Sequence, residues 1–234
     1  MSIAIGFLVF PDVQQLDLTG PYEVLASLPA ATMHLVWKST APIVSATGLV
    51  LQPTATFASC PALDLLCVPG GRGVNALMED SETLAFVRRQ AAAARYVTSV
   101  CTGALVLAAA GLLHGRRATT HWGAFDLLSR FGAVPTQGRI VRDGHFITAG
   151  GVTAGIDFGL VIAAELAGRT EAETIQLSLE YAPDPPFNAG TPETASAAAL
   201  AAARARGRAS REAREAITAR IAPARDESSA STDR

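Results

Sequence analysis

Cys101 stands where a side chain is typically exposed for covalent chemistry. It follows the apolar run 97–100 and precedes Thr102, Gly103 and a helical pattern that begins at Ala104. Small residues two positions before and two after the cysteine give the spacing of a nucleophile elbow, with cysteine in the role of serine. Because a helix N-terminus carries partial positive charge, we expect the thiolate form of Cys101 to be favoured. The sequence therefore predicts a cysteine nucleophile at a turn between a strand and a helix.

The other two cysteines are expected to have no role in chemistry. Cys67 lies within the apolar run 63–68 and is interpreted as a small buried hydrophobic residue. Cys60 precedes Pro61 in a polar turn. Three cysteines without paired spacing form neither a metal motif nor a disulfide framework. This usage predicts free thiols, no metal site and a location in the reducing cytoplasm.

A glycine turn ends the strand-like run 63–68. In Pro69-Gly70-Gly71, adjacent glycines allow backbone N–H groups to approach a substrate atom without steric hindrance. We expect the amides of Gly71 and Thr102 to form an anion hole, since both turns would lie at one edge of the sheet. A plain turn at Gly71 is the alternative.

Two acidic residues follow the first strand-like run, 3–9. Asp17 would face the same edge of the sheet as Cys101, whereas its alternative role is a charge in the first turn of a helix. A carboxyl group close to a thiolate has its pKa raised and can hold a proton for acid catalysis. Glu23, within the helix that follows, is the second candidate for this acid.

Only one of the four histidines is placed to reach Cys101. His121 ends the segment that follows the helix after the nucleophile, and a Cys–His pair is typical of proteases and amidases. The alternative is that Trp122 packs this turn against the protein and that His121 has no catalytic role. The remaining histidines fall in strands or at a helix end (His34, His114 and His145).

The elements that must position these residues alternate between strands and helices. Strand-like runs at 3–9, 34–37, 63–68 and 97–100 are separated by helical patterns at 16–28, 82–93 and 104–113. This alternation predicts an α/β fold whose mostly parallel sheet is covered by helices on both faces. A length of 234 residues with 49% hydrophobic residues fits one well-cored domain, which we place at 1–190.

Local signals predict the connections after residue 113. We expect a strand at 118–120, a helix at 122–131 ended by Gly132, and a hairpin whose turn is Asp143-Gly144. Gly150 and Gly151 are interpreted as a hinge before a helix that begins near Thr153. Thr170 and Glu173 fit the capping box of the following helix.

The composition changes after Tyr181. Several prolines precede an Ala/Arg-rich helix at 195–221, so 191–234 is interpreted as a helical extension with a frayed end at 226–234. The net charge of −2 gives no general attraction to nucleic acid or anionic lipid. The uncharged segment 96–115 is interpreted as strand, turn and helix rather than a membrane span, and the first residues lack a secretory leader. These features predict a small-molecule partner, with no nucleic acid and no membrane.

In order along the chain, these motifs resemble the ThiJ/PfpI superfamily, relatives of the class I glutamine amidotransferase domain with a flavodoxin-like sheet. Within it the sequence is most similar to the isonitrile hydratases, over about residues 2–192. The segments that carry the resemblance are QQLDLTGP at 14–21, TSVCTG at 98–103, ATTHW at 118–122, GIDF at 155–158 and EYAP at 180–183. The resemblance implies a homodimer that hydrates R–N≡C to an N-formamide without a cofactor.

The resemblance also assigns roles to the site residues. Cys101 would attack the terminal isonitrile carbon to give a thioimidate, with Asp17 as general acid and base and Thr102 assisting. An apolar substrate pocket is expected, with Trp122, Val152, Ile156 and Tyr181 in its wall.

Two other functions for Cys101 remain open at this point. One is a redox sensor or chaperone, and the other is an enzyme of the glyoxalase or amidase type. Thr102 stands where the peptidase-like members have histidine, and Asp17 where many members have glutamate. Both departures argue against proteolysis and deglycation.

Overall fold

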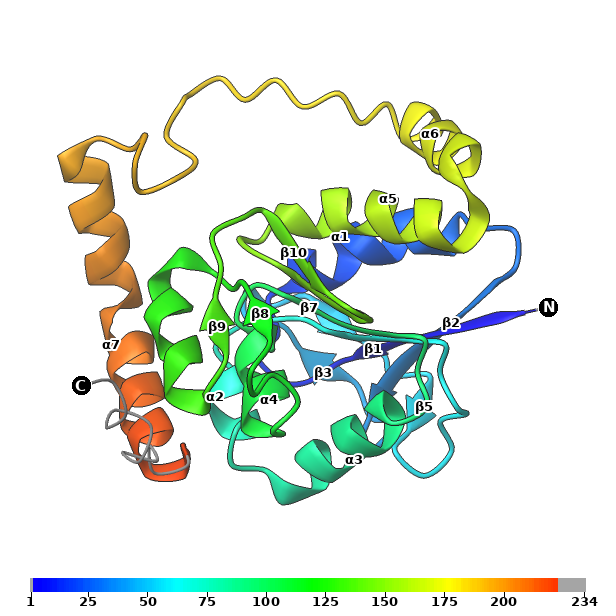
Figure 1. Ribbon diagram of the computed structural model, residues 1–234, viewed down its shortest axis with the longest axis horizontal. Helices are drawn as coiled ribbons and strands as arrows, with labels where there is room; N and C mark the ends of the chain where they lie inside the picture. The colour runs from blue at the N-terminus through cyan, green and yellow to red at the C-terminus, as the bar shows by residue number, and fades with distance from the viewer. Residues whose placement is uncertain (1, 223–234) are drawn as a thin grey trace, which may run out of the picture.

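The computed structural model describes residues 2–222. A seven-stranded sheet runs through its centre in the order β10-β11-β7-β6-β1-β2-β5, and all neighbours are parallel except β10 and β11 (Figure 1). The strands are β1 (Ile3–Leu8), β2 (Ala31–Trp37), β5 (Ala55–Thr56), β6 (Leu65–Val68), β7 (Tyr96–Val100), β10 (Ile140–Asp143) and β11 (Phe146–Ala149). The predicted mostly parallel sheet is confirmed.

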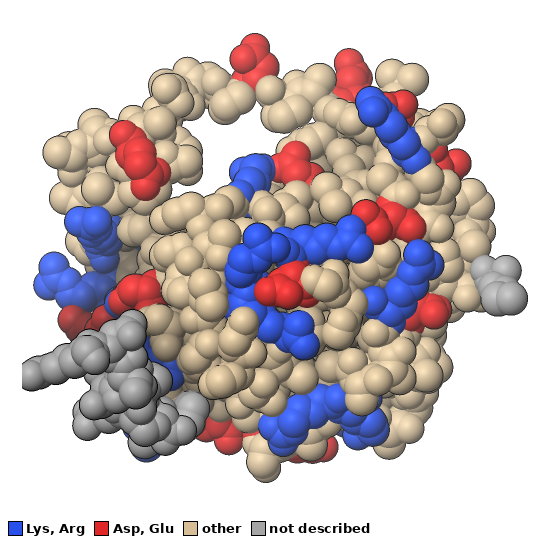
Figure 2. Space-filling view, in the orientation of Figure 1, with Lys and Arg blue, Asp and Glu red and all other residues tan. Residues whose placement is uncertain are grey.

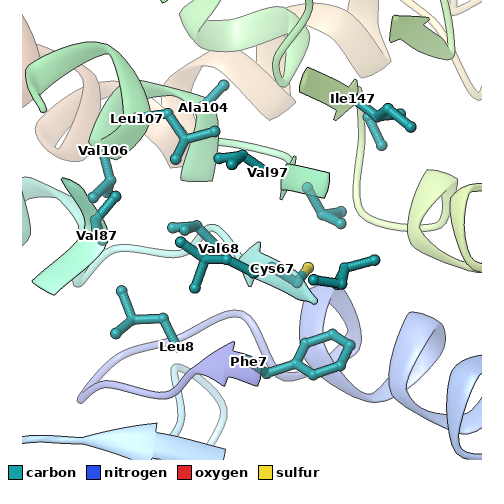
Figure 3. Close-up of a cluster of buried hydrophobic side chains, with 14 of the residues drawn as sticks. Phe7, Leu8, Cys67, Val68, Val87, Val97, Ala104, Val106, Leu107 and Ile147 are labelled. Atoms are coloured by element: carbon teal, nitrogen blue, oxygen red, sulfur yellow. The ribbon is translucent and has the colours of Figure 1, made fainter. Parts of the chain in front are cut away.

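Helices cover both faces of this sheet, which explains why its central strands are apolar throughout. One layer holds α1 (Gln15–Ala26) and α5 (Ala154–Ala167), and the other holds α2 (Val74–Leu77), α3 (Ser81–Ala91) and α4 (Gly103–Ala109) (Figure 1). Every residue of β6 and β7 is buried. Figure 3 shows side chains of β1, β6, β7 and α4 meeting in this core. The α/β class expected from the alternating pattern is confirmed.

The order of the strands determines where a site can form. From β1 the chain crosses to β2 on one side, and β6 is later added on the other side of β1. Adjacent connections therefore diverge at the carboxyl ends of β1 and β6, leaving a crevice there. The segments that follow β1, β6 and β7 bring Asp17, in the first turn of α1, together with Gly70 and Cys101 at this edge of the sheet.

Several connections form as the sequence predicts. The β10–β11 hairpin turns at Asp143-Gly144, where Gly144 has φ +62°. Gly132, with φ +73°, ends the helical segment that starts at Trp122. The helix predicted at 122–131 is η1 (Trp122–Phe131), a 3₁₀ helix.

The predicted strand at 118–120 and the predicted end of the helix at residue 113 are both wrong. Only β8 (Arg117–Ala118) forms in the segment expected as a strand at 118–120, and it pairs with β9 (Val134–Pro135) outside the main sheet. The hydroxyl of Thr120 is instead bonded to the Cys101 carbonyl. α4 ends at Ala109 rather than at residue 113.

The capping box also fails. α6 (Arg169–Ser178) begins directly after Gly168, so Thr170 is already helical and cannot cap it. Glu173 pairs with Arg169, one helical turn before it, instead of reaching back to a cap.

The C-terminal helix docks on the domain. An irregular connection, 181–196, leads from α6 to α7 (Ala197–Ile221), which packs beside η1 and α2 (Figure 1). Arg211 binds Asp126 and Arg220 binds Glu79, both through two nitrogen–oxygen contacts. The frayed end predicted at 226–234 lies outside the described residues. Among the described residues, no helix combines the length and apolar character needed to cross a membrane.

Candidate active site

Cys101 forms a strained elbow between β7 and α4. It is one of three non-glycine residues in the described chain with positive φ, at +55°. Its N–H donates to Ala149 O over 3.0 Å, and its carbonyl accepts a 2.7 Å bond from the Thr120 hydroxyl. A Cβ added at Gly103 would lie 2.0 Å from Val68 O, so the turn can pack against β6 only with glycine there. The backbone therefore holds the cysteine in an unfavourable conformation, as expected of a nucleophile elbow.

Asp17 lies beside this cysteine. It sits in the first turn of α1 and is fully buried, and its Oδ2 accepts the Gly70 N–H over 2.9 Å. A Cβ added at Gly70 would lie 2.6 Å from Thr102 N and 2.8 Å from Asp17 Oδ2. The carboxyl group and the Thr102 amide thus converge over a glycine, and the charge of Asp17 acts on the neighbouring Cys101 thiol. The structure brings together the predicted nucleophile and the predicted acid.

The environment of this pair favours its protonated forms. Burial raises the pKa of the Asp17 carboxyl from 3.8 to about 7, although hydrogen bonds from Gly70 and Cys101 lower it. Burial, followed by the charge of Asp17, raises the pKa of the Cys101 thiol well above its usual value. The expectation that the helix N-terminus would favour a free thiolate is not met, since burial outweighs the Thr102 hydrogen bonds. The pair retains a proton near neutral pH.

The Thr102 hydroxyl accepts a hydrogen bond from the Gly71 amide, one of the two amides that were expected to form an anion hole. The Gly71 N–H donates to Thr102 Oγ1 over 3.1 Å. The anion hole predicted from both amides is therefore not open at Gly71 in this structure, because a side-chain hydroxyl occupies its donor.

Cys101 and Thr102 line a cavity of about 1050 Å³. Of the wall residues predicted from the sequence, Trp122 and Val152 line it. Ile156 and Tyr181 do not. Ile156 packs beside Gly20 of α1, and the Tyr181 hydroxyl donates to Asp157 over 3.0 Å. The cavity also departs from the expected apolar character, because α7 contributes arginines to its wall.

His121 lines the cavity, and its side chain caps the N-terminus of η1. Its Nδ1 accepts the Gly123 N–H over 3.1 Å at the start of η1. Burial, with the Arg214 charge, lowers the pKa of this imidazole. Within the described residues it makes no hydrogen bond to Cys101, so the structure does not form a Cys–His pair.

The remaining candidates lie away from the reacting groups. Glu23 is exposed on α1, and Cys60 is half-buried in its turn. Cys67 is fully buried, which raises the pKa of its thiol to about 12 and confirms its structural role (Figure 3).

Gly150 and Gly151 connect β11 to α5 without backbone strain. A Cβ at Gly150 would meet nothing closer than 3.6 Å, and one at Gly151 nothing within 4 Å. Neither residue has positive φ. This conformation therefore does not itself require glycine at either position.

Sequence reasoning missed three residues of the site. The Gly70 N–H donates to the Asp17 carboxylate, and the Thr120 hydroxyl donates to the Cys101 carbonyl. Arg214 of α7 lines the cavity. The doubled glycine signalled the turn without indicating which residue binds Asp17. No local pattern places an α7 residue over a site at the edge of the sheet.

A parallel sheet with a buried cysteine elbow and an acid at its carboxyl edge defines the class of protein. Residues 3–165 match the model of the DJ-1/PfpI family, and the chain belongs to that family. The chain is 61% identical over 222 residues to the isonitrile hydratase of Pseudomonas putida, covering 95% of this chain and 97% of that protein. The superfamily resemblance stated from the motifs is confirmed.

Solved structures agree with this assignment. A ThiJ/PfpI family protein from Pseudomonas syringae has a TM-score of 0.91 at 47% identity, covering 93% of this chain and 91% of that one. Drosophila melanogaster DJ-1beta has a TM-score of 0.71 at 23% identity, covering 78% of this chain and 100% of that one. The second likeness shows the shared fold alone.

Proposed function

We propose that this protein is an isonitrile hydratase that converts R–N≡C and water to the N-formamide. The single observation that carries the proposal is the juxtaposition of Cys101, which lines a large cavity, with the buried acid Asp17, whose pKa is raised to about 7. The 61% identity to a protein named isonitrile hydratase supports it. Addition of a nucleophile and a proton to one carbon needs such a pair and no cofactor.

The first half of the reaction forms a thioimidate. The reactive form of the pair has already lost one of its two protons, so that the Cys101 sulfur is a thiolate and Asp17 is a carboxylic acid. Asp17 gives its proton to the terminal carbon, while the thiolate bonds to that carbon and a C–N π bond moves its electrons to nitrogen. The product is R–N=CH–S–Cys. Because proton and sulfur arrive together, no free carbanion accumulates. The raised pKa of Asp17 makes its acid form available near neutral pH.

The second half releases the formamide. Asp17, now ionised, takes a proton from water as the water oxygen bonds to the thioimidate carbon, and passes this proton to the nitrogen. The second proton of the water stays on the hydroxyl of the adduct until the adduct collapses. Collapse of this adduct breaks the C–S bond, and the proton returns to the pair, leaving R–NH–CHO. The Thr102 N–H, at the N-terminus of α4 directly after Cys101, is suited to stabilise charge that develops on the sulfur. The Thr102 hydroxyl, held by Gly71, is suited to orient the water.

A panel of alkyl and aryl isonitriles, assayed by formamide production, tests this function. We expect turnover of at least one member and a kcat/KM that rises with pH around 7, because the pair must lose one of its two protons. A panel without any formamide would contradict the proposal. The redox-sensor alternative gains no support, since the raised thiol pKa disfavours the thiolate that peroxide attacks.

We also propose that Gly150 and Gly151 act as a hinge for α5 over the thiol. Gly150→Thr is expected to fold, because its Cβ would have ordinary contacts, but to slow turnover about tenfold by restricting the backbone. Stopped-flow single-turnover and steady-state rates measure the effect. Unchanged rates in a variant with wild-type thermal stability would count against the hinge.

A homodimer is the proposed assembly. The β3–β4 hairpin, β3 (Ile43–Val44) and β4 (Val50–Leu51), exposes apolar side chains at Val44, Leu49 and Val50 next to the loop that follows β1. An exposed apolar patch of this kind is typical of an interface. Light scattering should give twice the chain mass of 24.2 kDa; a single-chain mass would refute the dimer.

A further inference from the structure

The wall that α7 contributes to the cavity is basic. The cavity is lined by six arginines and two acidic residues: Arg72, Arg204, Arg206, Arg208, Arg211, Arg214, Asp126 and Glu212. Figure 2 shows basic side chains along α7 at the left of the view. Five of the six arginines come from this one helix. An apolar substrate alone gives no reason for this arrangement.

Arg214 differs from the others because it is buried. Its residue is 7% exposed, whereas Arg204, Arg206 and Arg208 are exposed. Nε donates to Asn75 Oδ1 over 3.0 Å, and Nη2 lies 3.3 Å from Ser210 Oγ. Asn75 is fixed in turn by its own bond to the Ser210 carbonyl. These neutral partners orient the guanidinium, and within the described residues they leave its Nη1 without a hydrogen bond.

The charge of Arg214 also lacks a counter-ion among the described residues. Asp126 and Glu215, the nearby carboxylates of η1 and α7, are both bound by Arg211. Asp17 accepts the Gly70 N–H, and Glu212 forms no ion pair in the described chain. Burial and the charge of Arg214 itself lower the pKa of the His121 imidazole. A buried cation without a paired anion is unfavourable, so such a site is suited to receive an anion.

We propose that Arg214 binds a carboxylate on the substrate, so that the preferred isonitriles carry an acidic group on the carbon skeleton. Cys101 and Arg214 line one cavity, and the charge of Cys101 acts on Arg214, so a short molecule could place its isonitrile carbon at one residue and its carboxylate at the other. The substrate class rests on the proposed function. The anion site itself does not, since it concerns only binding next to the thiol.

Alkylation of Cys101 tests the anion site without using hydration. Iodoacetate and iodoacetamide both form an S–C bond and release iodide, and they have nearly the same shape but differ in charge. Rates are followed by peptide mass spectrometry at Cys101, and the iodoacetate-to-iodoacetamide ratio is divided by that for N-acetylcysteine. We expect a normalised ratio of about ten or more, the effect of one charge-assisted bond. A wild-type ratio at or below one would overturn the proposal.

Variants assign the effect to one arginine. Arg214→Met should bring the ratio close to one, and Arg214→Lys should retain part of it. Arg220→Met is the matched control, because Arg220 lies on the same helix and binds Glu79 away from the cavity. A change in thiol pKa alters both reagents equally, so it leaves the ratio unchanged. Equal ratios in the wild type and in folded Arg214→Met would reject the assignment.

Hydration then tests the substrate class. We expect 3-isocyanopropanoate to exceed its methyl ester in kcat/KM by about tenfold in the wild type, with the preference lost in Arg214→Met. Turnover of the ester alone would refute the substrate class while supporting hydration. If neither compound reacts and the alkylation ratio is still high, the proposed function fails and the anion site stands.

Discussion

Cys101→Ala is expected to abolish isonitrile hydration, with a loss of kcat on the order of 10⁴-fold or more. The proposed intermediate is bonded to the Cys101 sulfur, and no other thiol lines the cavity in the described chain. Formamide production under saturating isonitrile measures the loss. Intact-mass spectrometry after rapid quenching should show a substrate adduct in the wild type and none in the variant.

Cys60→Ala is the matched control for this prediction. Cys60 is half-buried in a turn away from the cavity, so its removal should leave turnover within about twofold of the wild type. Near-UV circular dichroism and thermal unfolding establish that both variants are folded. Near-normal turnover in folded Cys101→Ala would end the thioimidate mechanism, although hydration by another route would remain.

A third substitution separates strain from chemistry at the elbow. Cys101→Gly removes the sulfur as Cys101→Ala does, but glycine tolerates the φ of +55° that alanine does not. Both variants should therefore be inactive, yet the glycine variant should be the more stable by about 1 kcal/mol. The elbow retains this conformation because the sulfur must project into the cavity.

The central part of the fold could be predicted because its strands are buried on both faces. β1, β6 and β7 form apolar runs of strand length, each followed by a turn and a helix, and this pattern has few other interpretations. Once a parallel sheet is expected, the carboxyl ends of these strands must share an edge. The proximity of Asp17, Gly70 and Cys101 follows from that topology rather than from any one motif.

Features that depend on distant neighbours could not be predicted. Strands of two residues, such as β5 and β8, have too little pattern to signal themselves. The capping box at Thr170 fails because Gly168 already allows the chain to turn into α6. The arginines in the wall of the cavity could not be predicted either. They come from α7, which reaches the cavity only because it packs against η1 and α2.

The pKa of the Cys101 thiol could not be predicted from the sequence either. The sequence places Cys101 before a helix, which favours a thiolate, but it does not give the depth at which the sulfur lies. In the structure Cys101 is 6% exposed and adjoins a fully buried acid, so desolvation raises the pKa of the thiol instead of lowering it. The expected proton on Asp17 is supported, and its main cause is burial rather than the neighbouring sulfur.

Asp17→Asn should abolish hydration and at the same time stabilise the protein at alkaline pH. The carboxyl pKa is raised from 3.8 to about 7 by burial, so the folded state binds this proton more tightly than the unfolded state. The stability that Asp17 provides is complete below about pH 4 and is lost as pH rises through about 7, a total of about 4 kcal/mol. Asparagine keeps an acceptor for the Gly70 N–H but never ionises.

Urea unfolding at pH 5 and pH 8 measures this effect. The stability advantage of Asp17→Asn over the wild type should grow by about 2.5 kcal/mol between the two pH values, with kcat reduced by about 10³-fold or more at both. Glu23→Gln is the control, because Glu23 is an exposed carboxyl on the same helix and should change neither quantity. An advantage that does not vary with pH would mean that Asp17 titrates normally, and the proton required by the first step would then have to come from another group.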